Sequence, residues 1–270
     1  MMKTSRLLLV VAFILFAVSC KKDEAGMKTD TTATDSGLSA DEVANLTVNS
    51  IAANSLGFAA IANDVTANAV SMNNISTDGG KTINAIDPNT LYQKCGSTVL
   101  DSTSNHGTIS SVTFSSFYKY ARTLNCTTGN IGTNVVNKIT YTGTVNAPNL
   151  TSNDSGTSTV TITGLAATAT QYTLSGTYTR KSIFTMKQNY QTYKAVGNIT
   201  LTTNNVVFSK PGGLLVSGTA SAVVSVVSSV GTFKYTGIFK FIGNNQATLT
   251  MNDKSVYKID LVTGYFARVQ

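Results

Sequence analysis

The side chains that most often do chemistry in proteins are scarce in this sequence. Its 270 residues include three cysteines and one histidine. From residue 102 onward there are only three acids, Asp154, Asp253 and Asp260, and no two of them lie closer than seven residues. Hydrolytic triads, zinc sites and most proton relays require histidine, paired carboxylates or clustered thiols. This inventory predicts that the protein is not an enzyme and holds no metal or other cofactor. His106 lies in the polar stretch Asp101–Gly107, where we expect an exposed loop.

Cys20 stands at the end of a targeting segment. Lys3 and Arg6 precede an uninterrupted apolar run over residues 7–18, and small residues lead from this run to the cysteine. Such a layout is typical of a secretory signal. The run is shorter than the roughly 20 apolar residues that span a bilayer. We therefore predict a signal peptide over residues 1–19.

The sequence Ala17-Val-Ser-Cys20 resembles a bacterial lipobox. This resemblance implies that the peptide is cut before Cys20 and that the thiol carries acyl chains such as palmitate. Just beyond it, Lys22, Asp23 and Glu24 resemble the surface-export signal of Bacteroidota lipoproteins, which implies an outer-membrane protein that faces the cell exterior. The alternatives are an ordinary signal peptide that ends near a cysteine, and a charged tether with no export role.

Two short motifs resemble the acceptors for O-glycosylation of exported Bacteroidota proteins. They are Asp30-Thr31-Thr32 and Asp101-Ser102-Thr103, with Thr31 and Ser102 as the candidate acceptors. Matches of three residues arise often by chance in a threonine-rich chain.

Cys95 and Cys126 remain once Cys20 is assigned to the lipid. In an exported chain, two thiols predict one disulfide. The bridge would close a loop of 32 residues, and in the chain-entropy model such a loop stabilises the fold by about 3 to 4 kcal/mol.

The mature chain begins with a tether and a helical segment. Residues 20–38 lack hydrophobic periodicity. A capping box at Ser39-Ala-Asp-Glu42 then opens a segment over residues 39–75 with apolar residues at approximately helical intervals. Gly57 is expected to kink or split this segment. We expect the helix or helix pair to pack on the sheet that follows, because heptad spacing for a coiled coil is not sustained.

Residues 76–270 form the predicted β domain, with the disulfide loop near its start. From about residue 108 polar and apolar residues alternate, as in a sheet with one buried and one wet face. Turn signals include residues 153–156 and 204–205. We predict a mainly β fold in which a long antiparallel meander forms a curved open sheet or half-barrel. An outer-membrane barrel is the less favoured alternative. The alternating segments are residues 138–145, 158–165, 171–180, 198–202, 215–224, 232–242, 247–251 and 255–261.

Four glycines occupy apolar-face positions in the middle of predicted strands. Glycine weakens a strand, so its repetition on one face requires a reason. We expect these residues to form a row where the sheet bends and aromatic rings lie over bare backbone. They are Gly143, Gly176, Gly218 and Gly237.

The segment from Tyr178 to Lys194 is the best candidate for a binding site. It combines cations with aromatic rings, which suits anionic groups and the faces of sugars or bases. The preferred alternative is an edge hairpin whose lysines prevent edge-to-edge pairing. The candidate residues are Arg180, Lys181, Phe184, Lys187, Tyr190, Tyr193 and Lys194.

Charge is distributed unevenly along the mature chain. Residues 20–101 carry a net charge of −5, whereas residues 102–270 carry +10. The basic part would attract an anionic glycan or lipid over a Debye length of about 8 Å. We expect no nucleic-acid partner. Lysines spread over the sheet for solubility are an alternative explanation.

From Cys95 onward, the chain resembles Bacteroidota lipoproteins in which a helical start precedes a Cys...Cys loop and threonine-rich strands, here with the motif Lys138-Ile-Thr-Tyr-Thr-Gly143. The resemblance implies no particular activity. We expect a non-catalytic binding or structural module. The alternative is a half-pipe carrier that binds a lipid or glycolipid in the concave face, which would require an apolar trough of about 300 Å³ or more.

Overall fold

The computed structural model describes residues 40–55, 57–73, 95–109, 111–128, 131–166, 168–188, 191–210, 213–228 and 231–269. The predicted signal peptide and tether therefore lie outside the described residues. The same holds for Cys20, Lys22, Asp23, Glu24 and Thr31.

Helices precede the strands, as predicted. They are α1 (Ala40–Asn49), the short 3-10 helix η1 (Ala53–Ser55) and α2 (Phe58–Asn73). The predicted split is confirmed, because Gly57 lies between η1 and α2. A Cβ atom at this position would lie 2.5 Å from the carbonyl carbon of Ile51. None of the described helices is long and apolar enough to cross a membrane.

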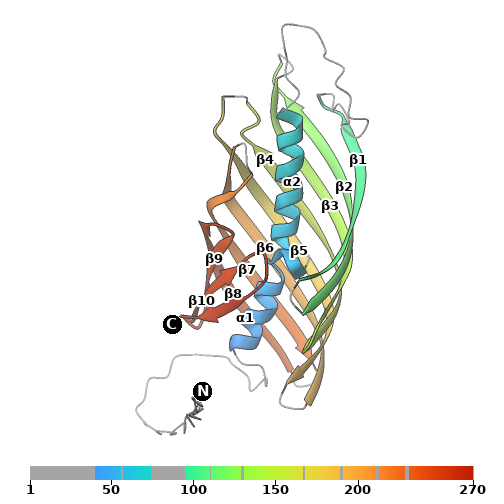
Figure 1. The fold of residues 1–270 in the computed structure, drawn as a ribbon, viewed down its shortest axis with the longest axis vertical. Coiled ribbons are helices and arrows are strands. Elements are labelled where there is room, and N and C mark those ends of the chain that lie inside the picture. The colour runs from blue at the N-terminus through green and yellow to red at the C-terminus, as the bar shows by residue number, and fades with distance from the viewer. Residues whose placement is uncertain are drawn as a thin grey trace, which may run out of the picture. The chain divides into compact units, whose positions relative to one another are not determined.

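One antiparallel sheet contains the eleven strands in the described residues, and their order in the sheet is their order in the chain. The edge strands β1 and β11 do not pair with each other across the described residues, so the sheet is open. Figure 1 shows it curving around the helices, which confirms the predicted curved meander. The strands are β1 (Thr98–Ile109), β2 (Val112–Cys126), β3 (Gly132–Ala147), β4 (Leu150–Thr163), β5 (Gln171–Gln188), β6 (Gln191–Ser209), β7 (Leu215–Ser228), β8 (Gly231–Gly243), β9 (Gln246–Met251), β10 (Val256–Asp260) and β11 (Phe266–Arg268).

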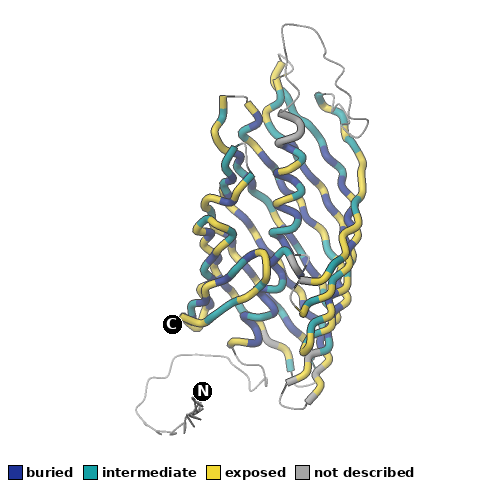
Figure 2. The backbone as a smooth tube through the Cα atoms, viewed as in Figure 1, coloured by how far each residue is buried: buried dark blue, intermediate teal, exposed yellow. Residues whose placement is uncertain are grey.

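Each strand has an inner face toward the helices and an outer face toward solvent. In β4, Val160 and Ile162 are fully buried, whereas Thr159 and Thr163 on either side of them are exposed. Successive side chains of a strand point to opposite faces, so this alternation follows from the backbone. Figure 2 shows the same alternation of buried and exposed residues along most strands.

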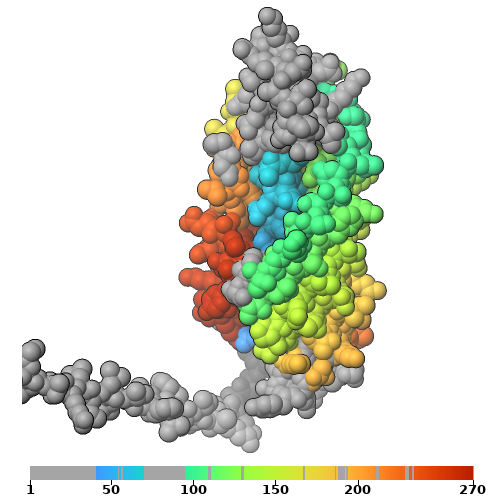
Figure 3. All heavy atoms as spheres, turned by 45° about the vertical axis from the view of Figure 1, so that its right-hand side comes forward, coloured from blue at the N-terminus to red at the C-terminus, as the bar shows by residue number. Residues whose placement is uncertain are grey.

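The helices occupy the hollow of the sheet and form one core with it. On the helical side, Val43, Ile51 and Ile61 have no exposed surface. The ring of Phe58 meets the ring of Tyr178 edge to face, with 6.4 Å between centroids. Figure 3 shows α2 lying in the opening between β1 and the C-terminal strands. Burial of these apolar side chains is the main favourable term that holds the helices against the sheet.

The stretch Asp101–Gly107 is part of β1, so the expected loop around His106 is wrong. β1 pairs with β2 from Thr98 to Ile109. It is an edge strand, and His106 and most of its neighbours are exposed. Polar side chains do not oppose strand formation where both faces are largely wet, so the polar composition was a poor guide here.

Two predicted turns also lie inside strands. Residues 153–156 belong to β4, where Gly156 lies under the ring of Tyr141, which a Cβ atom would approach to 2.5 Å. Residues 204–205 belong to β6 at a register shift, with Asn205 at a positive φ of 51°. Asn and Gly favour turns because they tolerate unusual backbone geometry and close approach, and a bulge or a covering ring requires the same properties.

The expected row of glycines is wrong. Gly218 and Gly237 lie on adjacent strands, but Gly218 pairs with Phe241 and is four residues out of register with Gly237. Gly176, Gly218 and Gly237 each meet a different neighbour. A Cβ atom on Gly176 would lie 2.7 Å from the Cα of Val160 on β4. Close contacts at separate places, with backbone at Gly176 and Gly218 and with the Leu249 side chain at Gly237, therefore account for these positions better than a single line of bending.

Cys95 and Cys126 form the predicted disulfide, with 5.6 Å between their Cα atoms. Cys126 is the last residue of β2, and Cys95 lies three residues before β1. The bridge therefore fastens the start of the edge strand to β2, its one neighbour among the described strands.

Candidate functional sites on the two faces of the sheet

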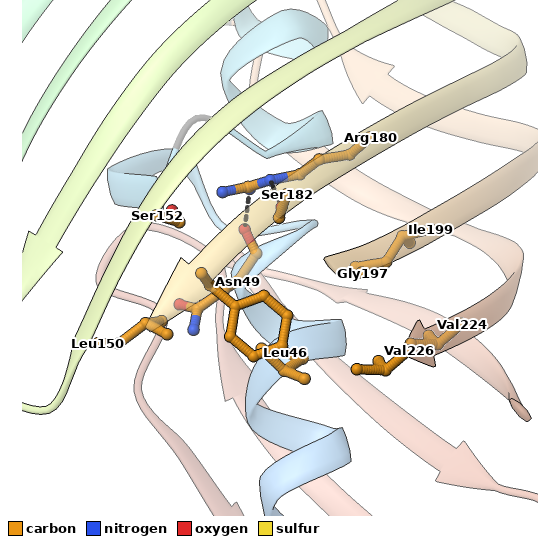
Figure 4. A pocket seen from close by; sticks show the side chains of 11 residues that line it. Leu46, Asn49, Leu150, Ser152, Arg180, Ser182, Gly197, Ile199, Val224 and Val226 are labelled. Carbon is orange, nitrogen blue, oxygen red and sulfur yellow. Dashed lines mark hydrogen bonds between the residues drawn. The ribbon is translucent and has the colours of Figure 1, made fainter. Parts of the chain in front are cut away.

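Arg180 joins the inner face of the sheet to the helical segment. Its Nη1 donates hydrogen bonds to the carbonyl oxygens of Asn49 (2.7 Å) and Ser55 (2.8 Å). These are the last residues of α1 and η1, where carbonyls lack helical partners and a cation is favourable. Its Nε and Nη2 donate to the two carboxylate oxygens of Asp154 on β4, at 3.0 and 2.7 Å. Figure 4 shows Arg180 reaching across to Asn49.

The Arg180–Asp154 pair is fully enclosed by polar partners. The side chain of Asp154 has no exposed surface, and that of Arg180 is 4% exposed. Ser152 and Ser182 also donate to Asp154, at 2.7 and 2.5 Å. Burial acts to lower the pKa of Arg180, but the neighbouring Tyr178 and Asp154 raise it above its ordinary value, so the guanidinium remains charged. The cluster therefore joins β4 and β5 to the ends of α1 and η1 through Arg180.

A line of tyrosines continues from this cluster along the inner face. The rings of Tyr141 and Tyr178 are stacked, with 5.6 Å between centroids, and their hydroxyls are 2.7 Å apart. Tyr118 lies 5.7 Å from Tyr141 and 6.1 Å from Tyr120, again between centroids. Tyr120 donates to Asp64 of α2 at 2.5 Å. Burial raises the pKa of Tyr118, Tyr120 and Tyr141, so the phenols remain protonated at neutral pH.

Arg122 is a second buried cation, on the side of the sheet near β1. It forms an ion pair with Asp101 of the edge strand. Its guanidinium lies 4.1 Å from the ring centroid of Tyr120. Burial lowers the pKa of Arg122. Since its partners come from β1 and β2, this pair contributes to the attachment of the edge strand.

The space beside Arg180 is too small for a ligand. Figure 4 shows the residues around it, which include Leu46 of α1 and Val226 of β7. Its volume is about 20 Å³, which is room for roughly one water molecule. A second space, beneath α2 beside Phe58 and Phe241, measures about 30 Å³.

A larger cleft lies at the end of the sheet beside α1. Its volume is about 410 Å³, within the range of small-molecule sites. Polar side chains from α1 face apolar ones from the strands across it. Its lining includes Glu42, Asn45 and Asn49 of α1, Val112, Val145, Ala147, Pro148, Asn149, Leu150 and Lys187 of the strands and their turns, and Thr263 with Gly264. Amides, a carboxylate and apolar walls together suit a ligand with both polar and apolar parts.

The candidate binding segment is divided between the two faces of the sheet. Arg180 and Phe184 are buried on the inner face, so they are not part of an exposed binding surface. Lys181, Lys187 and Lys194 are exposed on the outer face. The physical reason is the two-residue period of a strand, which sends Arg180 and Lys181 in opposite directions. Tyr190 lies outside the described residues, and the side chain of Tyr193 is likewise not described.

The outer face is basic. Asp154 is the only carboxylate between the first residue of β2 and the last of β8, and it is buried on the inner face. Lysines therefore have no acidic neighbours on the outer face of these strands. The exposed ones are Lys119, Lys138, Lys181, Lys187, Lys194, Lys234 and Lys240.

The candidate glycosylation site Ser102 lies on the edge strand β1. Its side chain is exposed and thus accessible to modification. Among the residues that the structure describes, no three side chains of His, Cys, Asp or Glu lie close enough together to hold a metal ion.

Sequence reasoning missed Asp154 as the partner of Arg180. One signal was present, since Asp154 has the same parity along its strand as the apolar Val160 and Ile162. A charged residue at an inward position predicts a buried partner. The other partners, the carbonyls of Asn49 and Ser55, lie over 120 residues away in sequence and carried no signal.

No protein-family model matches the chain, and neither a curated protein nor a solved structure matches it at a significant level.

Proposed function

We propose that the protein is a lipid-anchored, non-catalytic binding or structural module of the bacterial outer membrane, held by Cys20 and facing the cell exterior. The observation that carries this proposal is that the chain's own helices cover the inner face of the sheet. Its densest polar cluster, around Arg180 and Asp154, is bonded to the ends of the chain's own helices. The surface left for partners is then the outer face, the edges and the end cleft.

The lipid anchor is supported by the sequence around Cys20, which resembles a lipobox. Several acyl chains hold a protein at a membrane without a transmembrane element. Lys22, Asp23 and Glu24 support export to the outer surface, because the same composition follows the lipidated cysteine in Bacteroidota surface lipoproteins.

The test is a pair of variants in the cells that make the protein. Cys20→Ser should abolish incorporation of labelled palmitate and release the protein from the membrane fraction. Replacing Lys22, Asp23 and Glu24 with alanine should leave acylation intact but remove the protein from the reach of protease added to whole cells. Firm membrane retention of the Cys20→Ser variant with unchanged processing would refute the anchor.

A second candidate function is a carrier of lipid or glycolipid, and the end cleft favours it. The cleft has a volume of about 410 Å³ and apolar walls that include Val112 and Leu150. This volume is larger than the roughly 300 Å³ that a carrier requires. Because α1 and α2 pack against the inner face of the sheet, we place the ligand of such a carrier in the end cleft rather than in the concave face.

Native mass spectrometry of protein extracted from its own membranes separates the two functions. A carrier should retain a ligand mass beyond that of the covalent acyl chains, and Leu150→Arg in the cleft should remove it. Val223→Arg on the outer face is the matched control, since Val223 is 38% exposed and is not part of the lining of the end cleft. If neither the native protein nor the Val223→Arg control retained a ligand, the carrier function would be excluded.

A further inference from the structure

We infer that the outer face of the sheet carries a docking patch for an anionic lipid surface. The patch lies on the strands whose inner side is covered by α1. This inference rests on the proposed lipid anchor and adds the way in which the anchored domain lies on the membrane. The patch consists of three apolar residues and four lysines that surround them. Its members are Ile183, Val196 and Val227, with Lys181, Lys187, Lys194 and Lys234.

The apolar members form a continuous row across three strands. Ile183 of β5 pairs with Val196 of β6, and Val196 pairs with Val227 of β7. All three point away from the helices, because their neighbours Phe184 and Val226 are buried on the inner face. Adjacent strands lie about 4.8 Å apart, so the three side chains are in contact range. Ile183 is 57% exposed and Val227 49% exposed, so both apolar side chains lie open to solvent.

The lysines lie directly around this row. Lys181 and Lys194 are two residues from Ile183 and Val196 on the same strands, and therefore on the same face. Lys234 of β8 pairs with Ser225, two residues from Val227. Lys187 is four residues beyond Ile183 on the same face of β5, so it lies at the border of the patch, where it also lines the end cleft. The only carboxylate of β2 to β8 is buried on the inner face, so no acidic side chain of these strands lies beside the patch.

This combination of chemistry favours a lipid surface over a soluble polyanion. Lysine ammonium groups near a membrane are attracted to anionic headgroups, and apolar side chains between them gain by entering the interface. A polysaccharide would use the lysines but would have no use for exposed Ile and Val side chains.

The position of the patch agrees with the place where the chain enters the domain. Leu46 and Asn49 of α1 lie over the inner side of the same strands, beside Phe184 and Gly197. The described chain begins at Ala40 of this helix, twenty residues after Cys20. Twenty residues span at most about 70 Å, so the anchor keeps the patch within reach of the membrane. A tethered second contact needs little affinity of its own, because it occurs at high effective concentration.

Lysine footprinting tests the inference on the native acylated protein. The protein is placed in vesicles of phosphatidylcholine with or without phosphatidylglycerol, modified with a membrane-impermeant amine reagent, and mapped by peptide mass spectrometry. Lys181, Lys187, Lys194 and Lys234 should react about fivefold more slowly with phosphatidylglycerol present. Lys138 and Lys258 are internal controls, since they are exposed on the same face but outside the patch.

Two variants separate a patch from simple net charge. Ile183→Ser with Val227→Ser should reduce the protection of the four lysines, whereas Lys138→Glu with Lys240→Glu should not. Equal labelling of all outer-face lysines in both vesicle types would overturn the inference, and so would protection by soluble alginate that the Ile183 and Val227 changes do not affect. The mass of the peptide that contains Cys20 reports acylation separately, so failure of the patch is distinguishable from failure of the anchor.

Discussion

Arg180 on β5 and Asp154 on β4 form a buried ion pair whose guanidinium Nη2 lies 2.7 Å from a carboxylate oxygen, and the same guanidinium holds the last carbonyls of α1 and η1. The pair therefore connects three parts of the chain that are distant in sequence. Its role can be measured, because the neighbouring Lys181 offers a cation on the opposite face of the same strand.

Arg180→Met should destabilise the protein by about 3 to 5 kcal/mol, because it leaves the carboxylate of Asp154 buried without its partner. Lys181→Met, which removes the same charge from an exposed position, should change the free energy of unfolding by less than about 0.5 kcal/mol. Urea unfolding followed by circular dichroism measures both. The double variant Arg180→Met with Asp154→Leu should recover part of the loss, and equal effects of the two single variants would contradict a locking role.

Removal of the Cys95–Cys126 disulfide by a double change to serine should cost about 3 to 4 kcal/mol in the chain-entropy model. Because the bridge fastens the start of β1, amide hydrogen exchange should rise first in β1, an edge strand with one neighbour. Exchange that rises uniformly through β2 to β8 instead would show that the bridge does not act locally.

Gly156→Ala should destabilise the protein by roughly 1 to 3 kcal/mol through overpacking. The added Cβ atom would lie 2.5 Å from the ring of Tyr141 and 2.1 Å from the carbonyl oxygen of Thr179. Ser155→Ala, at the exposed position beside it, is the control, and thermal unfolding of the two variants should differ clearly. Unchanged stability of Gly156→Ala would mean that Tyr141 does not cover this glycine.

Alkaline pH should unfold the protein. Burial raises the pKa of Tyr118, Tyr120, Tyr141 and Tyr178 above the ordinary value near 10. The folded state therefore keeps protons that the unfolded state loses, so this stability is fully present below pH 10 and is lost as the pH rises further. Each such tyrosine contributes a slope of about 1.4 kcal/mol per pH unit.

Urea unfolding at several pH values above 10 measures this slope. Tyr118→Phe should reduce the slope by about 1.4 kcal/mol per pH unit, the contribution of one proton, since one buried phenol is removed. A slope that the variant leaves unchanged would show that Tyr118 titrates alike in the folded and unfolded states.

Local sequence patterns were sufficient for the class of fold. The two-residue alternation in the segments around Ile139, Val160 and Leu201 predicts strands with one buried face, and short connections predict a meander. The helical spacing that includes Val43 and Ile61, with a break near Gly57, predicts the helical start. These signals are local because they arise from the period of the backbone itself.

Local composition failed where the environment decides the outcome. The polar residues around His106 suggested a loop, yet pairing with β2 makes them an edge strand. Asn and Gly near Asp154 suggested a turn, yet the close approach of Tyr141 explains Gly156 and a buried arginine explains Asp154. The same residue types serve turns, bulges and close contacts, so composition alone does not distinguish among them.

The sequence by itself determined the periodicity of this protein and the pairing of its two later cysteines: its strands alternate in polarity, and Cys95 and Cys126 form the predicted bridge. The targeting segment that ends at Cys20 stays a prediction. Only the tertiary structure decided that Arg180 and Lys181 serve different purposes, one holding the helices in the hollow and the other facing solvent beside Ile183. The reason is that strand parity assigns a residue to a face, but the contents of each face depend on which distant segments the curved sheet encloses.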